Sequence, residues 1–301
     1  MRRLSGTVAA VVTPLEPAAD KVDLDAISGL CDFLSQGQVD AVMCLGTTGE
    51  GVLFSPRERM LVAQRFVDAG RGRFQVVVHA GAQSTKDTVA LAAHAASIGA
   101  DAVAVIGPPY FAPDHRGLVE HFVAAGQACS DRPYYLYEFA ARTGYHLSRE
   151  LVDAVRERVT NLCGMKVSNS SWDQVEPYLI EGLDLLVGYE PLIYRAKQAG
   201  AVGTVSGLAA AFPGEVRAVE TRPREGGARH LEELRQALNA VPTHSGLKWA
   251  LARQGLAIST RVRSPLRALD QSEEELLDRL LSVTLSWWPP QPGQTAPPPA
   301  G

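Results

Sequence analysis

Eight short apolar segments, rich in β-branched residues, alternate with longer helical patterns before about residue 215. This alternation is typical of strand–helix units on a parallel sheet, and eight such units are the number that closes a barrel. The sequence therefore predicts an α/β fold, a (β/α)8 TIM barrel, with strands at 7–12, 41–45, 75–79, 102–106, 134–138, 162–166, 183–187 and 202–206.

Apolar residues at three- and four-residue spacing predict helices between these strands. Ser55 and Pro56 supply a helix cap and a first-turn proline, and Gly99, Gly182 and Gly200 follow expected helix ends. The helices are expected at 24–36, 56–69, 85–98, 116–128, 148–156, 172–179 and 192–199.

The pattern changes after Pro213, where only helical segments follow, at 230–239, 245–252 and 273–285. We therefore expect a C-terminal three-helix appendage. From Trp287 onward the chain is rich in proline and cannot supply a core, which predicts disorder. The expected organisation is a catalytic barrel at 1–222, a helical region at 223–288 and a disordered Pro-rich tail at 289–301.

Composition excludes several classes of partner. The chain has 301 residues, 46% of them hydrophobic, and a net charge of -4, so it has no basic field to hold nucleic acid or an anionic membrane. Four scattered cysteines without metal-ligand spacing favour reduced thiols and a cytoplasmic location. No stretch is long and apolar enough to span a membrane, and prolines at 14 and 17 interrupt any signal-like segment. Small molecules and other subunits are the expected partners.

Lys166 stands at the end of an apolar strand, where a lysine is least expected. The other four lysines lie in polar or amphipathic segments: Lys21, Lys86, Lys197 and Lys248. Burial disfavours an ammonium group, so a desolvated lysine can use its free amine to attack a ketone and form a Schiff base. The alternative from position alone is a salt-bridged or snorkelling lysine.

Catalytic groups of such a barrel collect at the C-terminal ends of its strands. After the second strand comes Gly-Thr-Thr-Gly-Glu at 46–50, which offers backbone amides and two hydroxyls. The fifth strand carries Tyr137 near its end, and Arg142 follows on the next loop. Each feature alone is compatible with an ordinary turn, a core tyrosine and a surface arginine.

Together with Lys166, these segments resemble the family of dihydrodipicolinate synthase and N-acetylneuraminate lyase, the pyruvate-dependent class I aldolases. The resemblance runs from about Gly6 to about Leu285 and is specific for the family rather than for one member. Further motifs that carry it lie at 81–85, 99–102, 108–110, 142–144 and 200–206.

The resemblance implies that Lys166 forms a Schiff base with pyruvate, so that neither another cofactor nor a metal is needed. It implies that Tyr137 moves protons to and from the substrate. Thr47 and Tyr110 match its relay partners, and Tyr110 matches the tyrosine that the family donates across a subunit interface. A hydrogen-bonded chain of hydroxyls is a sensible aid, because a tyrosine near its ordinary pKa is a poor base.

Binding roles are implied in the same way. Gly46, Thr48 and the backbone near Val205 match the positions that hold the carboxylate of pyruvate. Arg142 matches the arginine that supports the carboxylate of the aldehyde partner, a role suited to its planar two-donor fork. A homotetramer built as a dimer of dimers is the implied assembly.

The expected reaction is that of 4-hydroxy-tetrahydrodipicolinate synthase, the condensation of pyruvate with aspartate 4-semialdehyde. Departures from the synthase pattern at Glu138, Ala140 and Val167 leave the aldehyde partner open, because loop shape and polarity select it. The alternative is an aldolase or dehydratase acting on 2-keto-3-deoxy sugar acids or N-acetylneuraminate. Glu138 could face a solvated loop or recognise hydroxyls of a sugar acid.

Two further hypotheses come from other classes. A metal-dependent barrel lyase could use Glu50, His79, Glu138 and Glu190, although these lack a recognisable metal-ligand spacing. A catalytically silent paralogue is the other, and retention of the full hydroxyl relay argues against it.

Regulation by free lysine is not expected. In the synthases that respond, the effector contacts two imidazole positions, an amide, an acid and a tyrosine at the tight-dimer interface. The matching positions here are Pro56, Arg59, Gln83, Asp87 and Pro109, so only the amide and the acid are kept in kind.

Overall fold

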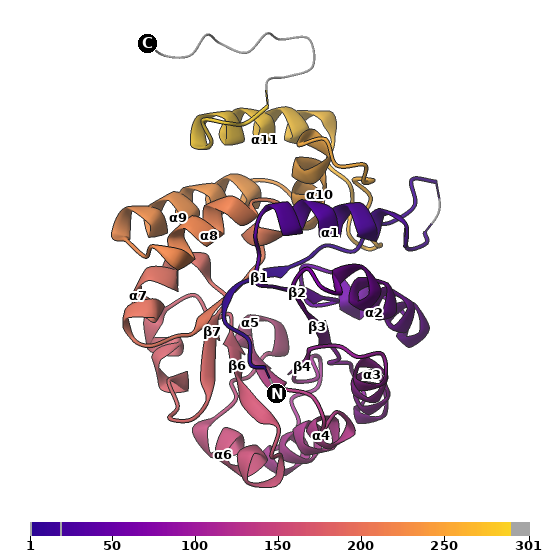
Figure 1. Ribbon diagram of the computed structural model, residues 1–301, viewed down its shortest axis with the longest axis vertical. Coiled ribbons are helices and arrows are strands. Elements are labelled where there is room, and N and C mark those ends of the chain that lie inside the picture. Colours follow the sequence, from indigo (N-terminus) through magenta and orange to yellow (C-terminus); the bar gives the residue numbers. More distant parts are fainter. Residues whose placement is uncertain (1, 19, 290–301) are drawn as a thin grey trace.

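A computed structural model describes residues 2–18 and 20–289 and confirms the predicted (β/α)8 barrel (Figure 1). The strands are all parallel and pair in chain order, and β1 closes the barrel against β8 through the pair Gly6 and Gly203. Their bounds are β1 Gly6–Ala10, β2 Ala41–Cys44, β3 Gln75–His79, β4 Ala102–Ile106, β5 Tyr134–Glu138, β6 Leu162–Val167, β7 Asp184–Val187 and β8 Gly203–Ser206.

Helices surround the barrel, and most begin where the sequence places them. Ser55 and Glu58 form a reciprocal capping box at the start of α2, as the Ser-Pro pair indicates. The helices between strands are α1 Ala26–Gln36, α2 Pro56–Gly70, α3 Thr85–Ser97, α4 His115–Ala128, α5 Ala140–Thr143, α6 Arg149–Arg158 and α7 Ile193–Gln198.

Three helix expectations were wrong. The segment expected as one helix at 172–179 forms two 3-10 turns, Trp172–Gln174 and Glu176–Tyr178, and Pro177 lies at the start of the second, where a proline ring is incompatible with a continuous helix. The chain also forms α8, Pro213–Thr221, and the short α5, Ala140–Thr143, where no helix was expected. Arg142 therefore lies on a short helix and not on a loop. Short 3-10 turns at Gly51–Leu53, Glu190–Leu192 and Leu208–Ala210 complete the connections.

The apolar core has two layers. One fills the space between the strands and the helices, and the other fills the barrel interior with small residues such as Ala10, Ala41 and Ala102. Tyr135 is the large interior side chain, and its hydroxyl accepts a hydrogen bond from the backbone of Leu4 at 2.8 Å. The barrel is therefore packed and closed on the N-terminal side, which leaves its C-terminal rim for ligands.

Three C-terminal helices follow the barrel: α9 Glu225–Asn239, α10 Thr243–Arg253 and α11 Gln271–Thr284. They stack beyond α8 and α1 (Figure 1). Contrary to the expectation of disorder from Trp287 onward, Trp288 is buried against Trp249 and Phe212, and its indole donates to Asp278 at 2.9 Å. Apart from Pro289, the expected Pro-rich tail lies outside the described residues.

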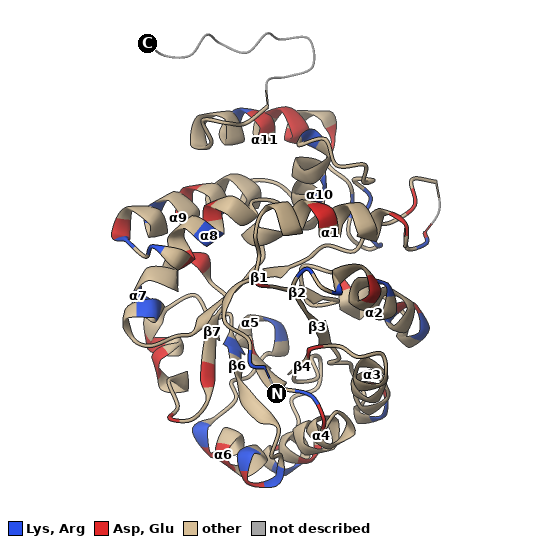
Figure 2. Cartoon of the chain, viewed as in Figure 1, with Lys and Arg blue, Asp and Glu red and all other residues tan. Residues whose placement is uncertain are grey.

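Charged residues lie mainly on the helices and loops, and few belong to the strands (Figure 2). Within residues 2–18 and 20–289, no helix combines the length and the apolar character needed to cross a bilayer. All four cysteines are free thiols and buried, and burial raises the pKa of Cys44 to about 12. These thiols are therefore core residues with little nucleophilic character.

Candidate active site

Lys166 and Tyr137 lie side by side because β5 and β6 pair in register at these two residues. Strand side chains alternate between the two faces of a sheet, and both residues point into the C-terminal mouth of the barrel. The Lys166 Nζ atom lies 4.0 Å from the centre of the Tyr137 ring. The Lys166 side chain is 4% exposed, so the amine is buried as predicted.

A short hydrogen-bonded chain starts at Tyr137. Its hydroxyl lies 3.2 Å from Thr47 Oγ1 and is also within hydrogen-bonding range of Ser168. Burial disfavours the phenolate, but the charge of Lys166 and these hydrogen bonds outweigh it, so the pKa of Tyr137 is below its ordinary value. A tyrosine in this setting exchanges protons more readily than an isolated phenol.

The turn after β2 places Thr47 and Thr48 at the mouth. Glu50 N donates to Thr47 O at 3.1 Å, and Gly51 N donates to Gly46 O at 3.2 Å. Gly51 is required sterically, since a Cβ atom there would collide with the carbonyl of Leu45. The turn is thus a compact loop folded back against the end of β2.

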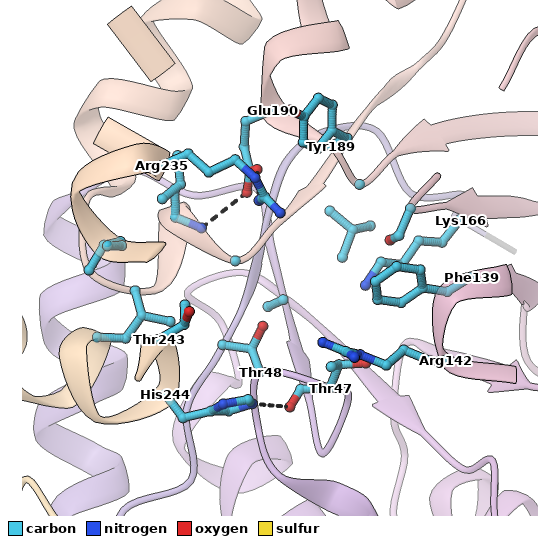
Figure 3. A pocket seen from close by; sticks show the side chains of 18 of the residues that line it. Thr47, Thr48, Phe139, Arg142, Lys166, Tyr189, Glu190, Arg235, Thr243 and His244 are labelled. Carbon is cyan, nitrogen blue, oxygen red and sulfur yellow. Dashed lines mark hydrogen bonds and ion pairs between the residues drawn. The ribbon is translucent and has the colours of Figure 1, made fainter. Parts of the chain in front are cut away.

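These residues surround a cavity of about 290 Å³ at the C-terminal rim. Of the predicted site residues, six line it: Thr47, Thr48, Tyr137, Arg142, Lys166 and Val205. Figure 3 shows the Lys166 and Arg142 side chains reaching into the cavity from the barrel side. Lys166 and the five other predicted residues from the rim therefore lie at one site.

Gly46 and Tyr110 do not line this cavity. Gly46 closes the turn through its carbonyl, as described above. Tyr110 is 85% exposed on the loop after β4 and has a φ of 79°. Its ring packs edge-on against that of Phe111, which is also exposed, at a centroid distance of 5.0 Å. Within one described chain it is therefore separate from Tyr137 and Thr47.

Glu138 has neither of the two roles that the sequence left open. Its carboxylate is buried, accepts hydrogen bonds from Leu147 N and Asn169 Nδ2 at 2.9 and 3.1 Å, and contacts His146 Nδ1 at 2.9 Å. The Asn169 side chain in turn accepts from Ala140 N at 3.3 Å. This network anchors the start of α5, the short helix that carries Arg142.

The four residues of the metal hypothesis are separated into different networks. Glu50 is paired with Lys248, Glu138 has the partners above, and Glu190 accepts from Ser206 and Leu208. His79 donates from Nδ1 to the Leu45 carbonyl at 3.0 Å, and its Nε2 accepts from Ile106 N at 3.4 Å. Burial, with the charges of Arg59 and Lys166, lowers the pKa of His79 to about 3. In the described part of the chain these side chains do not converge as a metal centre.

Sequence reasoning missed the contribution of the C-terminal helices. The cavity is also lined by Arg235 and Asn239 of α9 and by Thr243 and His244 of α10. Figure 3 shows Arg235, Thr243 and His244 across the cavity from Lys166. His244 Nε2 donates to the Thr47 carbonyl at 3.0 Å. Arg235 and Asn239 lie in an expected amphipathic helix, and Thr243 and His244 lie just before the next one, with no local motif, so only their tertiary position identifies them.

The fold and the site define a class. A closed parallel barrel with a buried lysine, a tyrosine–threonine pair and an arginine at its C-terminal rim is the arrangement of the Schiff-base lyases and aldolases. The chain belongs to the dihydrodipicolinate synthetase family, whose model matches residues 3–284. It is accordingly an enzyme of the lyase and synthase class.

Individual relatives agree with this family. An uncharacterised DapA-like lyase of Halobacterium salinarum is 35% identical over 91% of this chain and 92% of its own length. The 4-hydroxy-tetrahydrodipicolinate synthase of Sorangium cellulosum is 34% identical over 87% of this chain and 90% of its own. Among solved structures, the N-acetylneuraminate lyase of Proteus mirabilis has a TM-score of 0.85 at 26% identity, covering 94% and 99% of the two chains.

Proposed function

We propose that Lys166 forms a Schiff base with pyruvate and that the resulting enamine adds to a small aldehyde. The observation that carries this proposal is the buried Lys166 amine 4.0 Å from the ring of Tyr137, whose hydroxyl pairs with Thr47. The Lys166 amine attacks the ketone and water leaves, giving an iminium. Loss of a methyl proton, with the iminium as electron sink, gives the enamine.

The enamine carbon then bonds to the aldehyde carbon, and the aldehyde oxygen takes up a proton. Tyr137 is the proton carrier, because its lowered pKa and its contact with Thr47 suit both acceptance and donation. Hydrolysis of the iminium returns Lys166. The Thr48 hydroxyl and the backbone near Val205, both at the cavity wall, hold the carboxylate of pyruvate.

The specific reaction we propose is that of a 4-hydroxy-tetrahydrodipicolinate synthase, with aspartate 4-semialdehyde as partner. Arg142 supports this choice: it lines the cavity on α5, its guanidinium lies 5.5 Å from the Phe139 ring centre, and its fork suits a carboxylate. The Sorangium relative carries that name.

A second candidate is cleavage of a 2-keto-3-deoxy sugar acid. The observation that favours it is the extension of the cavity to polar side chains on α9 and α10, which leaves room for a hydroxylated partner. We propose the same Lys166 chemistry for both candidates, run in the cleavage direction for the second.

We also propose a homotetramer in which Tyr110 completes the relay of a neighbouring subunit. The exposed Tyr110–Phe111 pair supports this, because two large aromatic side chains on one loop are suited to an intersubunit contact.

Reduction with borohydride in the presence of pyruvate tests the proposal directly. We expect a reduced pyruvyl adduct on Lys166, located by peptide mass spectrometry, and no adduct in Lys166→Met. Lys197 serves as internal control, because it is ion-paired with Glu220 at 2.7 Å. An adduct at Lys197, or none at all, contradicts the proposal. A panel of aspartate 4-semialdehyde and several ketodeoxy acids then separates the two candidate reactions.

A further inference from the structure

The cavity has a second wall that the Schiff-base chemistry does not use. We call Arg235, Asn239, Thr243 and His244 the C-terminal wall; they come from α9 and α10, whereas the reacting groups come from the barrel. In Figure 3, Arg235 and Arg142 reach toward the cavity from opposite sides. A partner held at Lys166 would therefore have its far end between two guanidinium groups.

Arg235 is held firmly in place. Its Nη1 donates to Glu190 Oε2 at 2.8 Å, and its guanidinium carbon lies 4.7 Å from the Tyr189 ring centre. Glu190 is fully buried and is itself fixed, since its Oε1 accepts from Ser206 Oγ at 2.8 Å and from Leu208 N at 3.1 Å. Tyr189 donates its hydroxyl to Glu232 on the same helix as Arg235, at 3.2 Å.

Arg235 nevertheless keeps binding capacity. A guanidinium has five N–H donors, and within the described chain the Glu190 contact is the hydrogen bond that this group makes. The side chain is 33% exposed and lines the cavity, so the remaining donors have access to a ligand. Glu190 is the only carboxylate among the described lining residues, and its oxygens are already engaged.

The balance of charge at the partner's end of the cavity is therefore positive. Arg142 and Arg235 both project donors, and an arginine fork matches the geometry of a carboxylate or phosphate. A neutral sugar aldehyde could bind these guanidinium groups only through its hydroxyls. Such hydrogen bonds contribute less binding free energy than the charge-assisted hydrogen bonds of an anion.

We propose that Arg235 is a specificity-determining residue that binds an anionic group at the end of the partner substrate away from its carbonyl. The substrate class is thus an aldehyde that ends in a carboxylate or phosphate, in preference to a neutral aldose. This inference rests on the proposed Schiff-base function and adds to it a second, C-terminal contact beside Arg142. Glu190 and Tyr189 act as positioning residues for the guanidinium.

Two four-carbon aldehydes that differ only in the distal group test the charge requirement: 4-oxobutanoate, which ends in a carboxylate, and butanal, which does not. With pyruvate as co-substrate, we expect wild-type protein to prefer 4-oxobutanoate in kcat/KM. Arg235→Gln should raise the KM for 4-oxobutanoate about ten- to a hundredfold, the range for loss of one charge-assisted hydrogen bond. Its KM for butanal should stay within about twofold.

Arg229→Gln is the matched control, because Arg229 lies on the same helix, is 84% exposed and pairs only with Glu233 in the described chain. It should leave both KM values unchanged. Arg235→Lys keeps the charge without the fork, so it should fall between wild type and Arg235→Gln, and it serves if Arg235→Gln folds poorly.

Repeating the comparison with glyceraldehyde 3-phosphate and glyceraldehyde decides whether Arg235 binds a carboxylate or a phosphate. A larger effect of Arg235→Gln on the phosphorylated pair assigns the site to phosphate, and a larger effect on 4-oxobutanoate assigns it to carboxylate. Equal loss for charged and neutral aldehydes, or no loss for either, overturns the inference.

Borohydride trapping of pyruvate distinguishes a failure of the inference about Arg235 from a failure of the proposed Schiff-base function. If wild type and Arg235→Gln both form the Lys166 adduct but discriminate alike between 4-oxobutanoate and butanal, the inference fails and the proposed function stands. If wild type forms no adduct, the proposed function itself fails.

Discussion

Replacing Lys248 by methionine should destabilise the protein strongly, although this lysine lies in an ordinary amphipathic pattern. The Lys248 and Glu50 side chains are both 0% exposed, and their charged atoms lie 2.7 Å apart. Lys248 Nζ also donates to the Arg261 carbonyl at 2.7 Å, and Glu50 Oε2 accepts from Arg263 N at 2.6 Å. Burial lowers the pKa of Lys248, and the Glu50 carboxylate opposes this.

Removing one partner of such a pair leaves the other charge buried, which costs about 3–5 kcal/mol. We therefore expect Lys248→Met to lower the free energy of unfolding by this amount. Because Glu50 belongs to the turn that carries Thr47, the folded fraction should also have a reduced kcat. Urea unfolding followed by circular dichroism, at one fixed protein concentration, gives the free energy by linear extrapolation.

Two comparisons make the measurement decisive. The double variant Glu50→Gln with Lys248→Met leaves no unpaired charge, and it should be more stable than Lys248→Met alone. Lys86→Met replaces an exposed lysine on α3 and should change stability by no more than about 0.5 kcal/mol. A loss below about 1 kcal/mol for Lys248→Met, or a double variant no better than the single one, would refute the reasoning.

Four further outcomes are expected. Arg142→Ala should raise the KM for a carboxylated aldehyde about ten- to a hundredfold, while borohydride still traps pyruvate on Lys166. An unchanged KM would show that Arg142 does not bind the aldehyde partner. Tyr110→Phe should lower kcat far more than pyruvate affinity, and full activity of a monomer at high dilution would contradict the shared relay. Free lysine should not inhibit, because Arg59 stands where responsive synthases have an imidazole that contacts the effector. Arg59 is buried, and its guanidinium donates to the carbonyls of His79 and Gly81. Inhibition at sub-millimolar lysine would refute this expectation. Burial lowers the pKa of His121 from 6.5 to about 4, so the unfolded chain binds the proton first and the free energy of unfolding falls as the pH drops from 6.5 to 4. His121→Leu should lose about 3 kcal/mol less of its free energy of unfolding over this pH range than the wild type does. The same pH dependence of stability in both proteins, measured by urea titration, would exclude the effect.

Local sequence was sufficient for the architecture, and it singled out the lysine as a candidate. Short β-branched runs separated by helical periodicity reflect the different burial of strands and helices, so the eight strands could be placed within a few residues. Lys166 stood out because a charge at the end of a buried strand costs free energy unless the site uses it. The rule that the rim of such a barrel collects functional groups drew attention to Tyr137, Thr47 and Arg142, and the family resemblance implied their roles.

Tertiary structure alone decided which other residues join the site. Arg235 and His244 lie about 70 and 80 residues beyond Lys166 in sequence, on helices whose periodicity reports only which face is buried. Glu138 shows the converse, because its place beside Tyr137 on the strand left open both a solvated loop and contact with a sugar acid. Strand alternation turns it away from the mouth, and its carboxylate accepts hydrogen bonds from Asn169 and Leu147. Periodicity tells whether a side chain is buried, but the partner that it meets depends on how distant segments pack, and that information exists only in the folded chain.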